Sequence, residues 1–342
     1  MNKKTCTFKI GFAVLAASLL VVHGPASAQE PPAALVKAAQ AEGEMMFYGA
    51  IEEGQIKLLA SAFEKKYGIK SSHLRLVSGQ LVQRFVTEND GNGNQADVFL
   101  DSSPVAFRMH SDLFMPITAE KAPNVGAWPA KWRIGDRGIT IQTSPMVVQY
   151  NTDLVQPNDV PKTWKQLADP KWKGKVLLTD SRTSETYLGW LNAMEKNLGP
   201  DYVKRIAALN FTLTPSGASG AQMVAAGAQA LNFPAYASFS IALKEKKAPI
   251  ESQIVGEPQV VSQSSVGVAA KARHPNAAWL FLNFLLSEEG IKLACANYPV
   301  STPGDFAGKL GCIPLNDPQL VEYGISEERK QALLQLLGLT NR

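Results

Sequence analysis

A cationic side chain and two hydroxyls stand immediately before a predicted helix, in the run Arg182-Thr183-Ser184-Glu185. The first N–H groups of a helix have no partner within the helix, so they can hold an anionic oxygen together with nearby hydroxyls. The guanidinium of Arg182 would add a bidentate contact to such an oxygen. This segment therefore predicts a binding site for a small anion.

Three more serine-rich turns occupy comparable places in the chain. Ser216 and Ser219 lie in a Ser-Gly turn ahead of a helix of small residues, Ser78 opens a helix after a strand, and Ser102 and Ser103 follow another strand. A single serine before a helix can be an ordinary N-cap, worth about 1 kcal/mol. Four such turns at one predicted sheet edge favour anion binding.

Aromatic, amide and acidic side chains complete the predicted site. Tyr48 and Tyr236 could contact the carbon part of an organic ligand, or they could belong to the core. Asn232 lies in the strand that leads to Tyr236. Glu52 and Glu185 could bind an amine, which would suit an aminophosphonate or another zwitterion, or they could be solvated loop acids.

Catalytic chemistry has little support in the sequence. Beyond residue 28 the histidines are His73, His110 and His274, and none stands beside an obvious nucleophile. No Gly-x-Ser-x-Gly, Walker or His-Glu-x-x-His motif occurs. Asp101 and Asp180 could pair across a cleft as glycosidases require, although their sequence spacing does not fix their separation. We therefore expect a binding protein without cofactor or resident metal, with a secreted hydrolase as the alternative.

Alternating strands and helices must position these residues. Apolar strands at 45–48, 74–77 and 97–100 alternate with segments of helical periodicity, and the pattern is repeated from about residue 150. Such alternation predicts an α/β fold with mainly parallel sheets, which bind ligands beyond the carboxyl ends of their strands. The serine turns all fall at those ends.

The length of the chain predicts two domains. Crossing segments near 143–150 and 260–265 would join them and form a hinged cleft that closes on its ligand. We assign residues 29–145 and 263–342 to the first lobe and residues 146–262 to the second.

The first 28 residues have the features of a cleaved export signal. Three lysines precede an apolar stretch from Ile10 to Val22, and Ala26-Ser27-Ala28 supplies the small residues that a signal peptidase needs. The apolar stretch is shorter than the roughly 20 residues of a membrane span. We therefore expect cleavage after Ala28 and a periplasmic protein without stable membrane insertion.

Composition beyond the signal agrees with export. Cleavage would leave 314 of the 342 residues, with 31 basic and 30 acidic side chains, because the signal holds three of the 34 basic residues and no acid. This balance gives no case for nucleic acid or an anionic membrane surface as partner. Cys295 and Cys312 remain, either as a disulfide, which the oxidising periplasm favours, or as two buried thiols.

Four motifs resemble those of the periplasmic solute-binding proteins of ABC importers. They are PKTWKQLADPKWKGKVLLTDSR at 161–182, ADVFL at 96–100, YNTD at 150–153, and the stretch 276–303 with its FLLSEEG and YPV elements. The branch concerned includes ferric-ion, sugar-phosphate, phosphonate, thiamine and polyamine binders. The resemblance spans nearly all of the chain after the signal. It implies a two-lobed type II periplasmic binding protein fold with a hinge and an interlobe cleft, a monomer, and an inner-membrane ABC permease as partner.

The resemblance also bears on the ligand. Ferric members hold iron with a histidine or acid in the first loop, a carboxylate after the third strand and two adjacent tyrosines. At these places the chain has Glu52, Ser102 and Pro234-Ala235, with only Tyr236 nearby. Ferric iron favours several charged oxygen ligands. We therefore expect a small organic anion, such as a phosphonate, phosphate ester or carboxylate, with ferric iron as the alternative.

Overall fold

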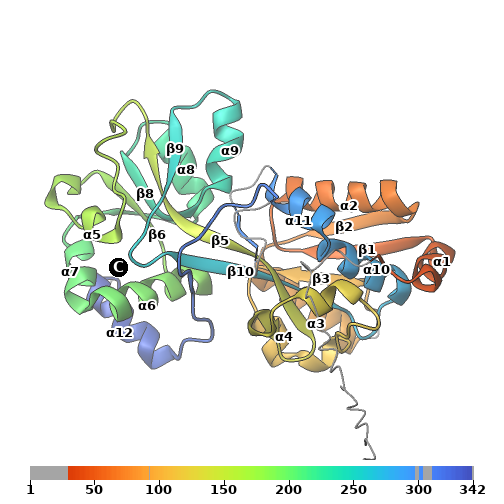
Figure 1. The fold of residues 1–342 in the computed structure, drawn as a ribbon. Coiled ribbons are helices and arrows are strands. Elements are labelled where there is room, and N and C mark those ends of the chain that lie inside the picture. Colours follow the sequence, from red (N-terminus) through yellow and green to blue (C-terminus); the bar gives the residue numbers. More distant parts are fainter. Residues whose placement is uncertain (1–29, 92, 297–299, 303–309, 341–342) are drawn as a thin grey trace, which may run out of the picture.

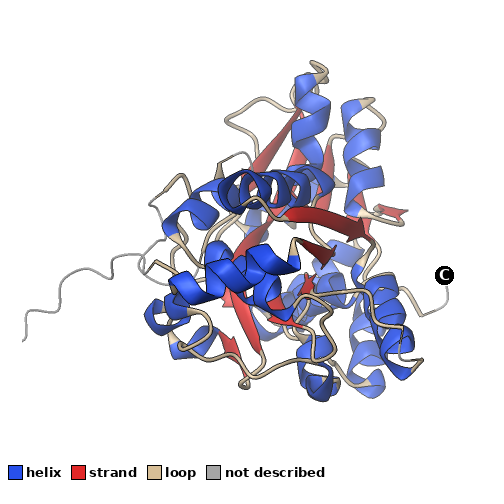
Figure 2. Ribbon diagram, turned by 90° about the vertical axis from the view of Figure 1, so that its right-hand side faces the viewer, coloured by secondary structure: helices blue, strands red, loops and turns tan. Residues whose placement is uncertain are grey.

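The computed structural model describes residues 30–91, 93–296, 300–302 and 310–340, and the predicted export signal lies outside them. Two lobes are joined by two long strands, β5 and β10 (Figure 1). Helices pack around the strands of both lobes (Figure 2). This arrangement confirms the α/β class.

The first lobe is built on three parallel strands, with β1 hydrogen-bonded between β2 and β3. Helix α2 ends where the sequence predicts, because Gly68 adopts a left-handed φ of 71° and its N–H donates to the carbonyl of Glu64. The elements of this lobe are α1 (Ala33–Glu42), β1 (Glu44–Gly49), α2 (Glu53–Tyr67), β2 (Lys70–Arg75), α3 (Ser78–Asp90), β3 (Val98–Asp101), α4 (Val105–Met109), the short 3-10 helices η1 (Ser111–Leu113), η2 (Pro123–Ala127) and η3 (Ala130–Trp132), β4 (Arg133–Ile134), α10 (Pro275–Leu285) and α11 (Glu288–Cys295).

Two antiparallel strands cross between the lobes, β5 (Gly138–Asn151) and β10 (Val260–Val268). The first half of β5 pairs with β10, and its second half pairs with β8 and β9. The sheet order is β2-β1-β3-β10-β5-β8-β6-β7. The two crossing segments expected from the sequence are therefore confirmed, as parts of one antiparallel pair.

The second lobe repeats the parallel arrangement, with β6 between β7 and β8. Its elements are α5 (Trp164–Leu167), η4 (Pro170–Trp172), β6 (Val176–Thr179), α6 (Glu185–Leu198), α7 (Pro200–Ala207), β7 (Thr212–Thr214), α8 (Gly217–Ala225), β8 (Leu231–Tyr236), α9 (Ser238–Glu245), β9 (Ile250–Ile254), β11 (Gln319–Leu320) and α12 (Glu327–Leu337).

Each lobe has its own hydrophobic core. In the first, Phe281 of the almost wholly buried helix α10 packs edge-on against Phe47 and Phe63, with ring centroids 5.1 and 5.0 Å away. In the second, Trp164 and Trp190 pack with centroids 5.3 Å apart. Aromatic pairs of this kind contribute beyond simple area burial, so they help to stabilise each lobe separately.

The C-terminal helix α12 lies on the second lobe. Leu333, Leu334 and Leu337 pack into the core of that lobe, and Arg329 Nε donates to Asn192 Oδ1 at 2.9 Å. This differs from the assignment of all residues 263–342 to the first lobe. The leucine spacing indicates an amphipathic helix, but it does not indicate which lobe supplies the apolar partner.

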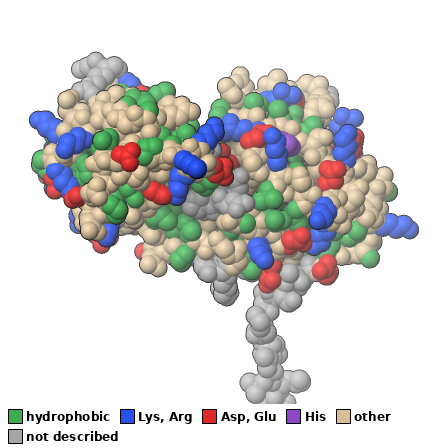
Figure 3. All heavy atoms as spheres, turned by 90° about the horizontal axis from the view of Figure 1, so that it is seen from above, with side chains coloured by type: hydrophobic (Ala, Val, Ile, Leu, Met, Phe, Trp, Pro, Cys, Tyr) green, Lys and Arg blue, Asp and Glu red, His purple; other side chains and the backbone are tan. Residues whose placement is uncertain are grey.

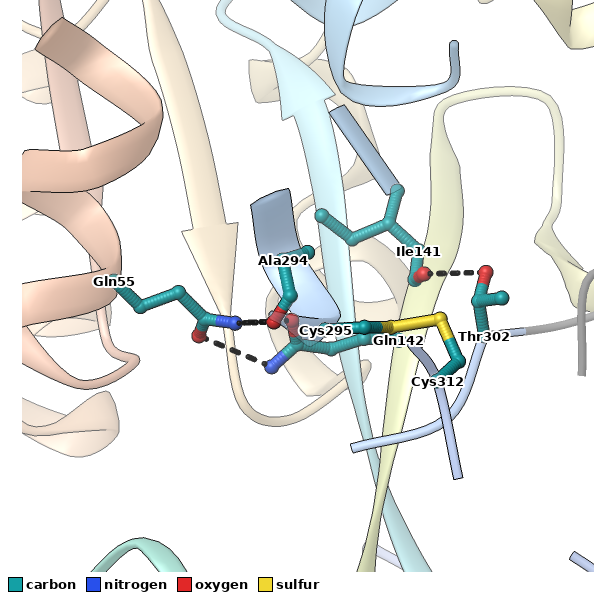
Figure 4. The surroundings of a disulfide bond; sticks show 7 residues. All are labelled: Gln55, Ile141, Gln142, Ala294, Cys295, Thr302 and Cys312. Carbon is teal, nitrogen blue, oxygen red and sulfur yellow. Dashed lines mark hydrogen bonds between the residues drawn. A yellow bond between two sulfur atoms is a disulfide. The ribbon is translucent and has the colours of Figure 1, made fainter. Parts of the chain in front are cut away.

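A disulfide joins Cys295 at the end of α11 to Cys312, which confirms the pairing that the oxidising compartment favours. Beside it, Gln55 Nε2 donates to the Ala294 carbonyl at 2.7 Å and to Gln142 Oε1 at 3.1 Å (Figure 4). These bonds tie α2, β5 and α11 together. Within the described residues, no helix is both long and apolar enough to span a membrane.

Candidate functional site

A cleft of about 970 Å³ lies between the lobes. Loops after β1, β2 and β3 line it from the first lobe, and the loops before α6, α8 and α9 line it from the second. Gln142 and Ser144 of β5 and Ser262 and Ser264 of β10 complete the lining. Seen from above, the surface is hollowed between the two lobes (Figure 3).

Five helices of eight or more residues begin at this cleft: α2, α3, α6, α8 and α9. Ser184 caps α6 by accepting from the Thr186 N–H, and Ser216 caps α8 by accepting from the Ser219 N–H. Helices α2, α3 and α9 have no side-chain cap. Each N-terminus carries a partial positive charge of about half an elementary charge. The five together attract negative charge into the cleft.

The side-chain charges of the cleft are mixed. Arg75 is the one basic residue in the described lining, and its Nε donates to the Ile51 carbonyl at 3.3 Å. Three acids, Glu52, Asp101 and Glu185, also line it. The cleft therefore offers donors from backbone, hydroxyl and guanidinium groups, and acceptors from carboxylates.

Eight of the twelve predicted site residues line this cleft. They are Glu52, Ser78, Ser102, Ser103, Thr183, Ser184, Ser216 and Tyr236. The structure thus brings all four serine-rich turns to one cavity, two from each lobe. Their common place follows from the parallel strands, whose carboxyl ends meet at the same sheet edge.

Arg182 does not line the cleft. Its guanidinium forms several bonds with the Asp180 carboxylate, the shortest 2.7 Å, and reaches the Leu339 carbonyl beyond α12 at 3.5 Å. Burial alone would raise the pKa of Asp180, but the bonds from Arg182 outweigh it and lower that pKa. Arg182 therefore fixes the loop before α6 to its own lobe, outside the lining of the cleft.

Three other predicted residues are also outside the cleft lining, and each is held by hydrogen bonds within the protein. The Tyr48 hydroxyl donates to Glu88 at 3.0 Å, and Tyr48 packs with Phe99 in the first lobe. Asn232 is fully buried and donates to Gln149 at 2.9 Å. The Ser219 hydroxyl donates to the Ser216 carbonyl at 2.9 Å. Ser216, one turn earlier, is the helix cap that faces the cleft.

Three tyrosines lie together at the cleft, and only Tyr236 of them is predicted from the sequence. Tyr187 and Tyr236 line the cleft with ring centroids 6.5 Å apart, and Tyr323 donates to the Ser102 carbonyl at 3.2 Å. Burial raises the pKa of Tyr187 to about 12. Burial, and then the phenols of Tyr323 and Tyr187, raise the pKa of Tyr236 well above its ordinary value. These residues come from distant segments, so sequence proximity could not reveal them.

Asp101, at the end of β3, also lines the cleft, although its sequence pattern indicates only a possible carboxylate pair with Asp180. Its side chain has no exposed area, and neither carboxylate oxygen has a hydrogen-bond partner among the described residues. Burial raises its pKa to about 7, although the Ser78 hydroxyl and the Ser102 N–H lie near enough to lower it in part without forming hydrogen bonds of ordinary geometry. The sequence feature that could have indicated Asp101 as a site residue is its position at the end of a strand, directly before two serines.

Metal chemistry has limited support from the usual ligands. In the part of the chain that the structure describes, no three His, Cys, Asp or Glu side chains gather in a way that could hold a metal ion. The hard oxygen donors in the lining of the cleft are the phenols of Tyr187 and Tyr236 and the carboxylates of Glu52, Asp101 and Glu185.

Comparison with known sequences places the chain among binding proteins. A model of the bacterial extracellular solute-binding protein family matches residues 59–303. The Fe(3+)-binding periplasmic protein of Serratia marcescens is 24% identical over 346 residues, covering 95% of each chain. An uncharacterized protein of Haemophilus influenzae is 26% identical over 268 residues, covering 75% of this chain and 76% of its own.

Solved structures share the fold. HitA from Pseudomonas aeruginosa, with iron bound, has a TM-score of 0.65 at 21% identity and covers 86% of this chain and 98% of its own. AfuA from Actinobacillus pleuropneumoniae, a periplasmic binding protein with fructose-6-phosphate bound, has a TM-score of 0.67 at 23% identity, with 87% and 99% covered. The two-lobed type II periplasmic binding protein fold is thus confirmed.

Proposed function

This chain belongs to the family of bacterial extracellular solute-binding proteins, and on that basis we propose that its cleft captures a small organic anion by closure. It is the periplasmic solute-binding component of an ABC importer. Proteins of this family deliver small ligands to ABC permeases, and its relatives are binding proteins rather than enzymes. The proposal concerns the chemical class of the ligand.

The convergence of five helix N-termini on one cleft carries this proposal. Uncapped N–H groups from α2, α3 and α9 would donate to the oxygens of a phosphonate, phosphate ester or carboxylate. The hydroxyls of Ser78 and Ser102 would close on the anion from the first lobe, and Thr183 and Ser184 from the second. Arg75, in place of the predicted Arg182, would supply the positive side chain.

A thermal-shift screen of the protein without residues 1–28 tests this function. The probes are inorganic phosphate, glucose 6-phosphate, ethylphosphonate, 2-aminoethylphosphonate, citrate, thiamine, spermidine and ferric citrate. A ligand that binds only the folded state must raise the melting temperature. A rise with one class of organic anion supports the proposal, whereas a rise with thiamine or spermidine alone contradicts it.

A matched pair of arginine variants sharpens the result. Arg75→Ala removes the cationic side chain of the cleft and should weaken anion binding by at least about tenfold, because a charge-assisted bond is lost. Arg205→Ala removes an exposed arginine on α7 and should leave affinity unchanged. Equal affinity of both variants and the unaltered protein would remove Arg75 from the site.

Ferric iron is the second candidate, favoured by the phenols of Tyr187 and Tyr236 in the cleft and by the names of several relatives. Phenolate and carboxylate oxygens suit this hard cation. Iron bound to phenolates should give a visible absorption band, and Tyr236→Phe should abolish it. A band together with no response to any organic anion would establish iron in place of the anion.

A further inference from the structure

Asp101 is a buried acid of the cleft that receives no hydrogen bond of ordinary geometry from the described residues. It lines the cleft, has no exposed area, and lacks a hydrogen-bond partner for either carboxylate oxygen among the described residues. Leaving a buried carboxylate without a partner is costly, whereas a partner supplied by a ligand would remove that cost on binding. Asp101 therefore indicates a donor group on the ligand.

The neighbours of Asp101 indicate that the donor is positively charged. Glu185 acts on Asp101 from the second lobe and makes its ionisation harder, whereas the Ser78 hydroxyl and the Ser102 amide ease it. Tyr323 is a further titratable neighbour, and its phenol stays protonated because burial raises its pKa. Among the described residues, no lysine or arginine shifts the pKa of Asp101. Two carboxylates of opposite lobes thus line one cleft, and no cation of the described residues acts on Asp101.

We propose, building on the function proposed above, that Asp101 and Glu185 bind an ammonium group, so that the ligand is a zwitterion. The anionic head would lie at the helix N-termini, and the amine would lie between the two acids. An ammonium has three donors and a full positive charge. It can satisfy Asp101 and relieve its repulsion with Glu185 at once, which a hydroxyl cannot do.

Closure of the cleft gives this pairing a role in selectivity. If the cleft closed on an anion without the amine, the Asp101 carboxylate would stay unpaired inside it or would have to take up a proton. Sites built to pair a polar group reject analogues that lack it, because their own buried groups are then left unsatisfied. We therefore expect the protein to prefer the zwitterion over the simple anion by at least about tenfold.

Pairs of probes that differ only in the amine test this directly. Isothermal titration calorimetry should compare 2-aminoethylphosphonate with ethylphosphonate, and β-alanine with propionate, so that both head chemistries are covered. Tighter binding of the amine-bearing member, by at least about tenfold, is expected. Equal or weaker binding of the amine-bearing member of every pair that binds would overturn the inference while leaving the proposed function intact. Failure of all four probes, with binding of another organic anion of the thermal-shift screen, would also overturn the inference and leave the proposed function intact.

Substitutions of the two acids test whether they cause the preference for the amine-bearing ligand. Asp101→Asn should reduce the preference for the amine at least about tenfold, and Glu185→Gln should reduce it by a smaller factor because Glu185 is exposed. Asp201→Asn, on the exposed face of α7, should preserve the preference. If Asp101→Asn folds poorly, Glu185→Gln alone decides, and an unchanged preference in that variant contradicts the proposal.

The pH dependence supplies an independent readout. Binding of the ammonium needs the ionised form of Asp101, whose pKa in the free protein is raised by burial to about 7. Affinity for 2-aminoethylphosphonate should therefore rise between pH 6 and pH 8 more steeply in the unaltered protein than in Asp101→Asn. The ligand's own titration is common to both proteins, so parallel curves would contradict the assignment.

Discussion

The hydroxyl of Tyr323 donates to the carbonyl of Ser102 at 3.2 Å, and this bond connects the two lobes directly. Tyr323 packs against the core of the second lobe, whereas Ser102 follows β3 in the first. The bond lies close to Asp101 and Tyr236, where the walls of the cleft meet. A change in the relative position of the lobes would therefore break this bond and move the residues of the site.

Removing this hydroxyl should loosen the contact between the lobes. Tyr323→Phe is expected to lower the free energy of unfolding by about 1 kcal/mol, because the Ser102 carbonyl loses its partner. Urea denaturation followed by tryptophan fluorescence measures the change. Tyr202→Phe is a matched control, since the buried Tyr202 hydroxyl has no partner among the described residues. A loss as large in the control would show that the Tyr323 bond contributes nothing specific.

Arg182 should contribute to stability rather than to binding. Arg182→Ala removes the bonds to Asp180 and the contact with the Leu339 carbonyl, and should cost about 1 kcal/mol of unfolding free energy. Ligand affinity should stay within about twofold, which calorimetry can check. Lys204→Ala breaks an exposed ion pair with Asp201 and should cost less than about 0.5 kcal/mol. A large loss of affinity in Arg182→Ala would restore Arg182 to the site.

The Cys295–Cys312 disulfide should stabilise the protein. It closes a loop with a sequence separation of 17 residues, and a loop of that length contributes about 3 kcal/mol through restriction of the unfolded chain. The double variant Cys295→Ser, Cys312→Ser should show that loss in urea denaturation. A thiol assay of the unfolded protein should find no free thiol beyond residue 28 before reduction and two after it.

Asp101 should make stability depend on pH. Its folded-state pKa of about 7 lies above that of an unfolded aspartate, so between the two values the folded protein binds more protons. The unfolding free energy contributed by this group is therefore complete at low pH and is lost as pH rises through about 7. Asp101→Asn removes the dependence, so the variant should gain stability relative to the unaltered protein between pH 5 and pH 8. If the unfolding free energies of the variant and the unaltered protein differed by the same amount at pH 5 and at pH 8, the raised pKa of Asp101 would be contradicted.

Much of the fold could be predicted from the sequence because it rests on local chemistry. The alternation of apolar strands with amphipathic helices predicted the α/β class, and Gly68 and Ser184 mark helix ends where the structure has them. The serine turns reached one cleft because parallel strands direct their ends to one edge. The position of α12 was not predictable, since an apolar helix face does not specify its partner.

The site itself was decided by tertiary structure. Arg182 and Ser184 are two residues apart, yet only Ser184 lines the cleft, because Asp180 and the Leu339 carbonyl hold the guanidinium elsewhere. Tyr187, Tyr236 and Tyr323 meet only when both lobes and the C-terminal segment have packed. The sequence determined which strand ends carry polar groups, because that pattern is local. Only packing decided which of those groups keep unused hydrogen-bonding capacity for a ligand, because their partners come from distant segments.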